Sequence, residues 1–432
     1  MFQTGAPHFQ NGAEVAASQG FPSLQKRRVA VLCNPSSLVR AERPPYRRHH
    51  LVDVLRQAGV NVVKLFGPEH GLWSTAQDLI AVDAGIDPVF GVEVGTLYGR
   101  TVDTLTLEPE ALAGIDVLVF DIQDVGSRYY TYAATLCMAL ETCAQVGVEV
   151  VVFDRPNPLG GEVVEGNAVQ RRFKSFVGWI DVPQRHGLTV GEIARLYADE
   201  QGLTCKLTLV PCAHWDPAKY LDEQDFGPAG SPWYAPSPNM PTVATAITYP
   251  GTCLIEGTRL SEGRGTTRPF ELIGAPWLLG KNGLNARKYA QTIDSFLIPG
   301  LHVRPMLFEP TFQKFAGEVC GGVALEVVDR RAFPAVKAGL ALIAAARKLA
   351  PEHFAWRTET YEFVSDRLAI DLLMGGTHAR QVLENGGSLE EATSDFERDS
   401  RIFAERARPH LCYTRRTGLF ADGIRRTGRV AL

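Results

Sequence analysis

Residues 116–154, DVLVFDIQDVGSRYYTYAATLCMALETCAQVGVEVVVFD, decide the fold class because they hold a strand, a helix and a second strand in succession. The runs 117–122 and 148–153 are apolar at nearly every position, which predicts strands that are buried on both faces. Between them, residues 130–146 have the length and composition of a helix. A strand, a helix and a strand in this order predict a parallel sheet covered by helices.

The same alternation extends outward on both sides of this stretch. We expect further strands at 28–34, 62–66 and 203–211, and further helices at 49–58, 107–115 and 189–201. The last helix is predicted to begin at Thr189, with Glu192 three residues later completing a capping box. The chain is therefore predicted to be an α/β protein built on a parallel sheet.

Residues after about 280 are predicted to form a second, smaller unit. Helices expected at 286–296, 333–349 and 390–408 surround one strand at 322–328, a pattern typical of an α+β unit. The predicted organisation is an N-terminal extension (1–27), the α/β domain (28–280), a C-terminal α+β domain (281–413) and a basic tail (414–432). Residues 160–277 are rich in Pro and Gly, and so long a loop-rich stretch is usually functional.

Composition excludes several classes of protein. With 45% hydrophobic and 21% charged residues among 432, the chain is neither disordered nor fibrous. The formal net charge of −4 provides no basic field for nucleic acid, and we expect the basic stretches 40–50 and 414–432 to be solvated surface. No apolar run is long enough to span a membrane.

The cysteines and the N-terminus predict the compartment. Eight cysteines are scattered without a Cys-x-x-Cys pair, which is typical of reduced thiols in a protein core. Residues 1–28 contain no continuous apolar segment of the kind found in a secretory signal. We therefore expect a cytoplasmic protein.

Polar side chains follow three of the predicted strands, at the edge where doubly wound folds bind their ligands. They are Glu69 and His70 after the strand at 62–66, Asp121, Asp124 and Arg128 after the strand at 117–122, and Asp154, Arg155 and Asn157 after the strand at 148–153. One such loop means little, because Asp and Asn make turns in any protein. Three loops that meet at one edge predict a functional cluster.

Absent motifs narrow the chemistry of this cluster. No G-x-G-x-x-G follows a predicted strand and no G-x-x-x-x-G-K-[ST] occurs, so no nucleotide cofactor is predicted. The chain has no H-E-x-x-H, no paired Cys and His spacing for zinc and no G-x-S-x-G. Carboxylates with Arg and aromatic support remain, an inventory typical of sugar hydrolysis or of a binding cleft for a polar ligand.

The loop-rich stretch adds further candidates. Trp233 and Tyr234 carry rings of the kind that stack on a sugar, and Asn239 follows them. Glu256 precedes Arg264, which has a glycine on each side, as a backbone needs for close approach to a ligand.

In this order, the motifs resemble those of one bacterial family. They are Gly67-Pro-Glu-His-Gly71, Phe120-Asp-Ile-Gln-Asp-Val-Gly126, Arg128-Tyr-Tyr-Thr-Tyr132, Asp154-Arg-Pro-Asn-Pro158, Ser237-Pro-Asn-Met-Pro241, Tyr249-Pro-Gly251 and Glu262-Gly-Arg-Gly-Thr266. The family is that of the exo-acting β-N-acetylmuramidases, formerly a domain of unknown function, which remove N-acetylmuramic acid from the non-reducing ends of peptidoglycan fragments.

The resemblance covers residues 28–413 and carries expectations about the fold. It implies a Rossmann-like catalytic domain, a smaller C-terminal domain and an active site in the cleft between them. Two features depart from the family: Leu72-Trp-Ser-Thr75 stands where members usually carry Arg-Gly, and the export signal of many members is not seen. The first departure places one substrate contact in doubt.

The resemblance and the residues together predict a mechanism. Glycoside hydrolysis needs a carboxylic acid to protonate the leaving oxygen, and Glu69 is the candidate, since desolvation at the strand end would raise its pKa. Asp121 or Asp124 is the candidate second carboxylate, unless the acetamido group of the sugar supplies the nucleophile itself. The lactyl carboxylate of the sugar is expected to bind Arg128, Arg155 or Arg264. The predicted catalytic residues are Glu69, His70, Asp121 and Asp124, and the predicted substrate-binding residues are Arg128, Tyr130, Asp154, Arg155, Asn157, Asn239, Glu256 and Arg264.

Two other functions remain open on the sequence. One is a non-catalytic protein that binds an anionic sugar or a cell-wall fragment. The other is a metal-dependent hydrolase that uses His70 with Asp121 and Asp124, although no cofactor or metal motif is present.

Overall fold

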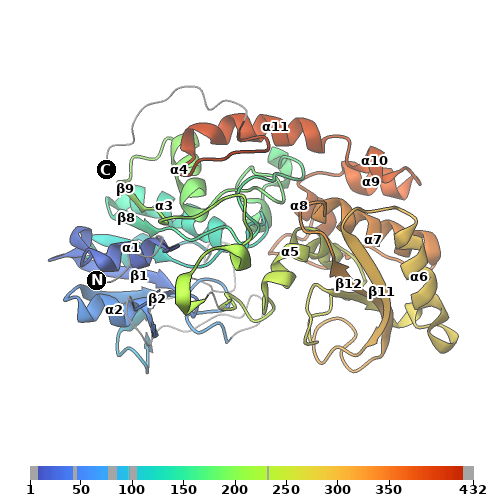
Figure 1. The fold of residues 1–432 in the computed structure, drawn as a ribbon, viewed down its shortest axis with the longest axis horizontal. Helices are drawn as coiled ribbons and strands as arrows, with labels where there is room; N and C mark the ends of the chain where they lie inside the picture. The colour runs from blue at the N-terminus through green and yellow to red at the C-terminus, as the bar shows by residue number, and fades with distance from the viewer. Residues whose placement is uncertain are drawn as a thin grey trace.

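The computed structural model describes residues 8–41, 46–75, 85–95, 97, 105–230 and 233–421. These residues form two units that lie side by side, an N-terminal unit around a large sheet and a C-terminal unit around a small one (Figure 1). In these ranges, no helix is long and apolar enough to cross a membrane.

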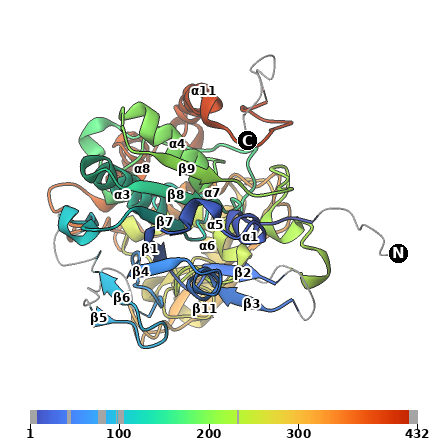
Figure 2. The same ribbon diagram turned by 90° about the vertical axis from the view of Figure 1, so that its left-hand side faces the viewer.

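The large sheet has seven strands in the order β5-β6-β4-β1-β7-β8-β9, which follow one another across Figure 2. They are β1 (Arg28–Cys33), β4 (Asn61–Phe66), β5 (Gly85–Ile86), β6 (Glu93–Gly95), β7 (Val117–Asp121), β8 (Glu149–Phe153) and β9 (Leu207–Val210). Only the edge strand β5 is antiparallel to its neighbour among these described strands. Numbering the parallel strands in chain order gives 3-2-1-4-5-6, the order of the Rossmann fold. The predicted α/β class is confirmed.

Alternate side chains of the central strands feed two separate layers of core. Val29 and Val31 of β1 pack with α1 (Gly12–Ser18) and α2 (Leu51–Gln57) on one face. Ala30 and Leu32 join the core that includes α3 (Tyr132–Val146) and α4 (Val190–Glu200) on the other. Burial on both faces explains why the interior positions of these strands are apolar. At the start of α4, Thr189 and Glu192 form the predicted capping box.

The second unit is built on an antiparallel sheet in the order β10-β12-β11. Its strands and helices are α5 (Val243–Thr252), β10 (Leu272–Ala275), α6 (Leu284–Asp294), β11 (Leu301–Phe308), β12 (Cys320–Val327), α7 (Ala335–Leu349), α8 (Ala369–Met374), α9 (His378–Glu384), α10 (Leu389–Ala392) and α11 (Phe396–Ala407). Strand β10 precedes the boundary predicted near residue 280 and pairs with β12 beyond it.

Two glycines allow α5 and α7 to pack with their backbones in contact. A Cβ at Gly251 of α5 would collide with the carbonyl oxygen of Ala335, and one at Gly339 of α7 would collide with the carbonyl oxygen of Gly251. This contact explains the glycine of the Tyr249-Pro-Gly motif. It fixes the helix that carries Tyr249 against the core of the second unit.

Several predicted elements differ from the structure. The helix expected at 107–115 is only a short 3₁₀ helix, Pro109–Leu112, which begins at Pro109 and ends before Gly114. The helix expected at 390–408 is two helices, because α10 begins at its own capping box on Ser388 and ends before α11. Strand β11 was not expected, since it is half solvated and contains Pro305, which an edge strand tolerates.

Residues 42–45 and 422–432 of the two basic stretches lie outside the described residues, and the described parts are not simply solvated surface, contrary to prediction. Residues 38–50 include the small β2–β3 pair (Leu38–Arg40 and Arg48–His50), and Arg40 donates hydrogen bonds to the carbonyl oxygens of Phe226 and Phe9. Arg415 is fully buried against Glu192 of α4, with 2.6 Å between Nη2 and Oε2. Helix α11 thus leads the chain out of the second unit, and the C-terminal segment 408–421 docks on the first (Figure 1).

Candidate active site

A cavity of about 250 Å³ lies where the two units meet. Residues from both units line it: Glu69, His70, Tyr129, Tyr130, Thr131, Tyr132, Val177, Ser237, Asn239, Met240, Tyr249, Glu256, Arg264, Phe270, Gln313, Arg357, Thr360, Tyr361 and Glu362. Of the predicted site residues, the cavity brings together Glu69, His70, Tyr130, Asn239, Glu256 and Arg264.

Glu69 lies in a tight turn directly after β4. The Gly71 N–H donates to the Pro68 carbonyl oxygen at 2.9 Å, and a Cβ at Gly67 would collide with the backbone of Leu72, so the turn needs its glycine. The Glu69 side chain is only 7% exposed, and Thr131 donates its hydroxyl to Oε2 at 2.7 Å. The carboxyl is thereby held at the cavity wall.

Backbone strain collects around this cavity. His70, Phe270, Gln313 and Glu362 all have φ between 46° and 73°, in the left-handed region that non-glycine residues rarely adopt. Such residues persist only where the surrounding structure holds them, and they cluster at functional sites. Four of the twelve non-glycine residues with positive φ in the described ranges lie at this cavity, which supports it as the candidate functional site.

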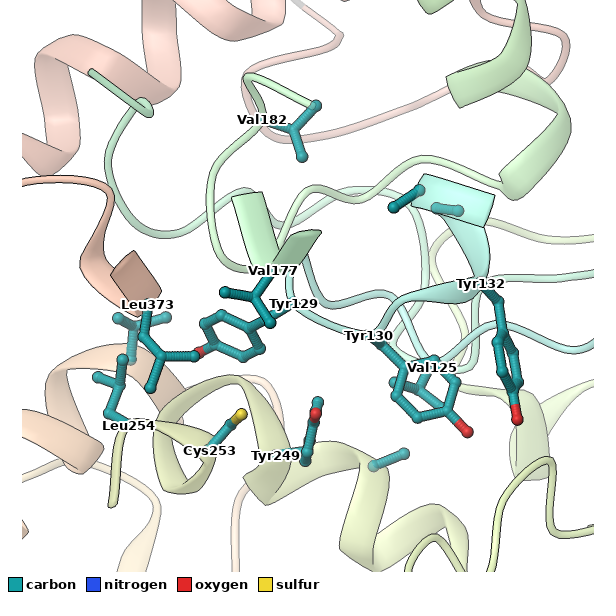
Figure 3. Close-up of a cluster of buried hydrophobic side chains, with 14 of the residues drawn as sticks. Val125, Tyr129, Tyr130, Tyr132, Val177, Val182, Tyr249, Cys253, Leu254 and Leu373 are labelled. Atoms are coloured by element: carbon teal, nitrogen blue, oxygen red, sulfur yellow. The ribbon is translucent and has the colours of Figure 1, made fainter. Parts of the chain in front are cut away.

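Tyrosines of the segment between β7 and α3 join the two units. Tyr129 donates its hydroxyl to the carbonyl oxygen of Pro250 in α5, while Tyr132 donates to the Pro236 carbonyl oxygen at 2.7 Å. Tyr130 lies between them against Tyr132 and Tyr249 (Figure 3). Burial raises the pKa of the Tyr130 hydroxyl well above its ordinary value, so it remains a neutral hydrogen-bond donor at the cavity.

The opposite wall carries a balanced network of charges. Arg264 lies 2.8 Å from Glu256 and 3.5 Å from Glu262, and Lys314 also pairs with Glu262 at 3.0 Å. Tyr361 donates its hydroxyl to Glu256 at 2.7 Å. Burial favours the neutral form of Glu256, but Arg264 and Tyr361 outweigh it and lower the pKa of that carboxyl. Glu256 is therefore an anion already neutralised by its own neighbour.

The glycines beside Arg264 face the protein itself and not a ligand. Gly263 and Gly265 both have φ near 80°, and a Cβ would meet the Leu272 carbonyl oxygen at 2.6 Å or the Phe312 backbone at 2.7 Å. They allow the loop to pack tightly, which fixes Arg264 in place.

Asp121 and Arg155 form a buried pair outside the cavity. Arg155 donates from Nε and Nη2 to the two carboxylate oxygens of Asp121 at 2.6 and 2.9 Å. Burial opposes the charge on Arg155, but Asp121 outweighs it and raises the pKa of the guanidinium. Arg155 instead borders a smaller pocket of about 70 Å³, together with Trp233 and Tyr234, the two aromatics considered for sugar stacking.

The remaining predicted residues also bind parts of the protein. Asp124 accepts a hydrogen bond from the Gly126 N–H, and burial raises the pKa of its carboxyl to about 7. Arg128 donates to the carbonyl oxygens of Asn167, Val182 and Leu373. These contacts hold the β7–α3 segment against both units.

Asp154 and Asn157 have similar roles after β8. Asp154 accepts from Thr189, from the Gly191 N–H and from Tyr413, and so anchors both α4 and the C-terminal segment. Asn157 donates to the Leu188 carbonyl oxygen at 2.9 Å. Neither residue lines the cavity.

The segment that departs from the family pattern packs beside the cavity. Leu72 is buried, and Trp73 stacks on Phe90 and donates its Nε1 proton to Asp87 at 2.7 Å. Ser74 donates to the carbonyl oxygen of Pro236 at 3.2 Å. The segment therefore supports the loop at 233–241 that carries Asn239.

The metal set considered from sequence is not assembled. Within the described ranges, no group of three or more His, Cys, Asp or Glu side chains is placed to hold a metal ion. His70 lines the cavity, whereas Asp121 faces Arg155 away from it.

Several residues that line the cavity could not be predicted from the sequence. Thr131 and Tyr249 stand inside the quoted motifs, but the sequence does not distinguish them from their neighbours. Gln313, Arg357 and Tyr361 belong to no motif and no predicted strand end. Only the packing of the second unit against the first brings them to the cavity.

Comparisons with known proteins cover nearly the whole chain. The family model described as exo-β-N-acetylmuramidase NamZ, N-terminal, matches residues 29–244, and the model described as its C-terminal counterpart matches residues 247–413. The peptidoglycan β-N-acetylmuramidase NamZ of Bacillus subtilis (strain 168) is 38% identical over 408 residues, which cover 94% of this chain and 92% of the relative.

Solved structures agree with these matches. Crystal structures of two DUF1343 family proteins from Bacteroides fragilis NCTC 9343 are similar, with TM-scores of 0.79 and 0.70 and identities of 29% and 27%. Each comparison covers 94% of this chain and 99% of the other.

Proposed function

The chain belongs to the exo-β-N-acetylmuramidase NamZ family of glycoside hydrolases, and we propose that it cleaves its substrate in the cavity beside Glu69. The substrate is a peptidoglycan-derived saccharide from whose non-reducing end N-acetylmuramic acid is released. The observation that carries the proposal is the buried Glu69 carboxyl, which accepts a hydrogen bond from Thr131 in a cavity lined by both units.

Glu69 is the general acid in this proposal. Glycoside cleavage needs a carboxylic acid at the leaving oxygen, and the cavity carboxyls are Glu69, Glu256 and Glu362. Glu256 is excluded because Arg264 and Tyr361 hold it as an anion. Glu69 differs in having a neutral hydroxyl as its hydrogen-bond donor, which a protonated carboxyl also tolerates.

The nucleophile is proposed to be the acetamido oxygen of the substrate. Asp121 faces Arg155 and Asp124 bonds the Gly126 amide, and neither lines the cavity. As Glu69 donates its proton to the glycosidic oxygen, the bond from that oxygen to C1 breaks and the acetamido oxygen bonds C1. That new bond closes a five-membered ring on the sugar. Glu69 then takes a proton from a water whose oxygen bonds C1 and opens this ring, so the product retains its configuration.

The proposal is tested with 4-nitrophenyl β-N-acetylmuramide. We expect the purified protein to hydrolyse it faster than the matching glucosaminide, to keep its activity in EDTA, and to release the β-anomer first. An inverted product contradicts acetamido participation, and loss of activity in EDTA favours the metal-dependent alternative. Binding without turnover indicates the non-catalytic alternative. The cytoplasmic location stays a prediction, which fractionation of the source cells tests.

A further inference from the structure

We infer that Arg357 binds the lactyl carboxylate of N-acetylmuramic acid and thereby sets the specificity of the cavity for a muramic over a glucosaminic sugar. The inference rests on the proposed function, since it assumes that this sugar occupies the cavity. It assigns the role to none of the three arginines expected from sequence.

The other candidate arginines are already bonded to the protein. Arg264 pairs with Glu256 and Glu262 on the cavity wall. Arg128 is buried under three carbonyl oxygens, and Arg155 pairs with Asp121 outside the cavity. A substrate carboxylate at any of them must displace an existing buried contact, which costs more than binding to an uncommitted cation.

Arg357 lines the cavity and has its charge available. Across the described ranges it forms no ion pair, and its guanidinium donates one hydrogen bond, from Nη2 to the Thr360 carbonyl oxygen at 3.3 Å. Its neighbour Glu359 is paired with Arg259 instead. Arg357 is half-buried, so an anion meets it without the full cost of desolvating a buried charge.

The position of Arg357 is fixed from two sides. Its backbone N–H donates to the Gly257 carbonyl oxygen at 2.9 Å, directly beside Glu256 in the chain. Its guanidinium stacks 4.9 Å from the centre of the Tyr361 ring, and that ring is itself held by the bond from its hydroxyl to Glu256. Within the described ranges the Arg357 side chain donates no hydrogen bond other than the one to Thr360, and a planar guanidinium can bind a carboxylate through two parallel hydrogen bonds.

Glu69 and Arg357 come from different units, and the sugar carries its scissile bond and its carboxylate on different ring atoms. Glu69 comes from the first unit and Arg357 from the second, so a ligand in the cavity contacts both. In N-acetylmuramic acid the scissile bond leaves the ring at C1 and the lactyl ether leaves it at C3. In the inferred complex, one sugar places its glycosidic oxygen at Glu69 and its carboxylate at Arg357.

Binding in a Glu69→Gln background tests the inference without turnover. Calorimetry would measure N-acetylmuramic acid, its methyl ester and N-acetylglucosamine against the background protein and against the same protein with Arg357→Met or Arg357→Lys. We expect Arg357→Met to weaken the free acid about 10- to 100-fold, since a hydrogen bond to a charged group contributes about 1.5–3 kcal/mol. The ester and N-acetylglucosamine should change less than about threefold. Arg357→Lys should restore only part of the affinity, because a point charge does not reproduce the fork.

Arg347→Met is the matched control. Arg347 also stacks on aromatic rings, those of Phe354 and Trp356, but does not line the cavity, so its loss should leave all three affinities unchanged. Equal weakening of all three ligands by Arg357→Met, or no weakening of the acid, overturns the inference. Failure of the proposed function looks different: the wild-type protein would then not hydrolyse the muramide.

Discussion

Removing the Asp121 carboxylate should destabilise the protein and leave its chemistry almost intact. Asp121 is fully buried and accepts two short hydrogen bonds from Arg155, whose guanidinium is also buried. Asp121→Leu strands that guanidinium, and breaking a buried pair by removing one partner costs about 3–5 kcal/mol. Arg155→Met should cost a similar amount, because it strands the carboxylate.

The double variant Asp121→Leu/Arg155→Met supplies the control. Replacing both members of a buried pair by apolar residues of similar volume is often neutral or stabilising, so the double variant should recover most of the stability lost by either single variant. Urea unfolding gives the free energies, and kcat is measured well below the melting temperature of the weakest variant.

We expect the folded single variants and the double variant to keep kcat within about tenfold of the wild type. The residual loss would come from movement of the loop after β7, which also leads into the Tyr130 segment. A fall of 10²-fold or more in kcat for the double variant, with its stability restored, would assign Asp121 to catalysis and refute the separation of this pair from the cavity.

Three further predictions concern stability. Burial raises the pKa of Asp124 from 3.8 to about 7, so the protonated carboxyl stabilises the fold below about pH 4 and this stability is lost as the pH rises through 7. Asp124→Asn should remove the loss, which amounts to up to about 4 kcal/mol at pH 8. Urea unfolding of both proteins at pH 4 and pH 8 measures it. Gly251→Ala should lower the melting temperature despite the better helix propensity of Ala, because its Cβ meets the Ala335 carbonyl oxygen and overpacking costs about 1–3 kcal/mol; an unchanged melt would contradict that contact. Arg415→Met leaves Glu192 buried without its cation and should lower the free energy of urea unfolding by about 3–5 kcal/mol. If this segment were solvated, the substitution would have no effect.

The elements of the first unit could be predicted because each of them is indicated by a short continuous stretch of sequence. Strands buried on both faces, such as Glu149–Phe153, are apolar at all but their end positions, and α4 begins at a capping box visible in the sequence. Glu69 could be found for the same reason, since it follows a strand at the edge where such folds bind ligands.

The second wall could not be predicted, because it depends on packing between distant segments. Arg357 reaches the cavity through its contact with Gly257 and through the docking of the second unit on Tyr129. Conversely, polar residues that follow strands also bind other parts of the protein. Asp121 and Asp154 lie at the expected sheet edge, where Asp121 pairs with an arginine and Asp154 anchors α4. The sequence alone does not distinguish these roles from substrate binding.

The most direct test of Glu69 as the acid is kcat of Glu69→Gln on two substrates that differ only in leaving group. Gln can still accept the hydrogen bond from Thr131 through its amide oxygen but has no acidic proton to transfer. With an N-acetylglucosamine leaving group, which needs protonation, we predict a loss of at least about 10²–10⁴-fold at an unchanged melting temperature. With 4-nitrophenolate, which needs little, the loss should be markedly smaller. Near-normal kcat on both substrates, or equal losses on both, would contradict the assignment of Glu69 as the acid at this cavity.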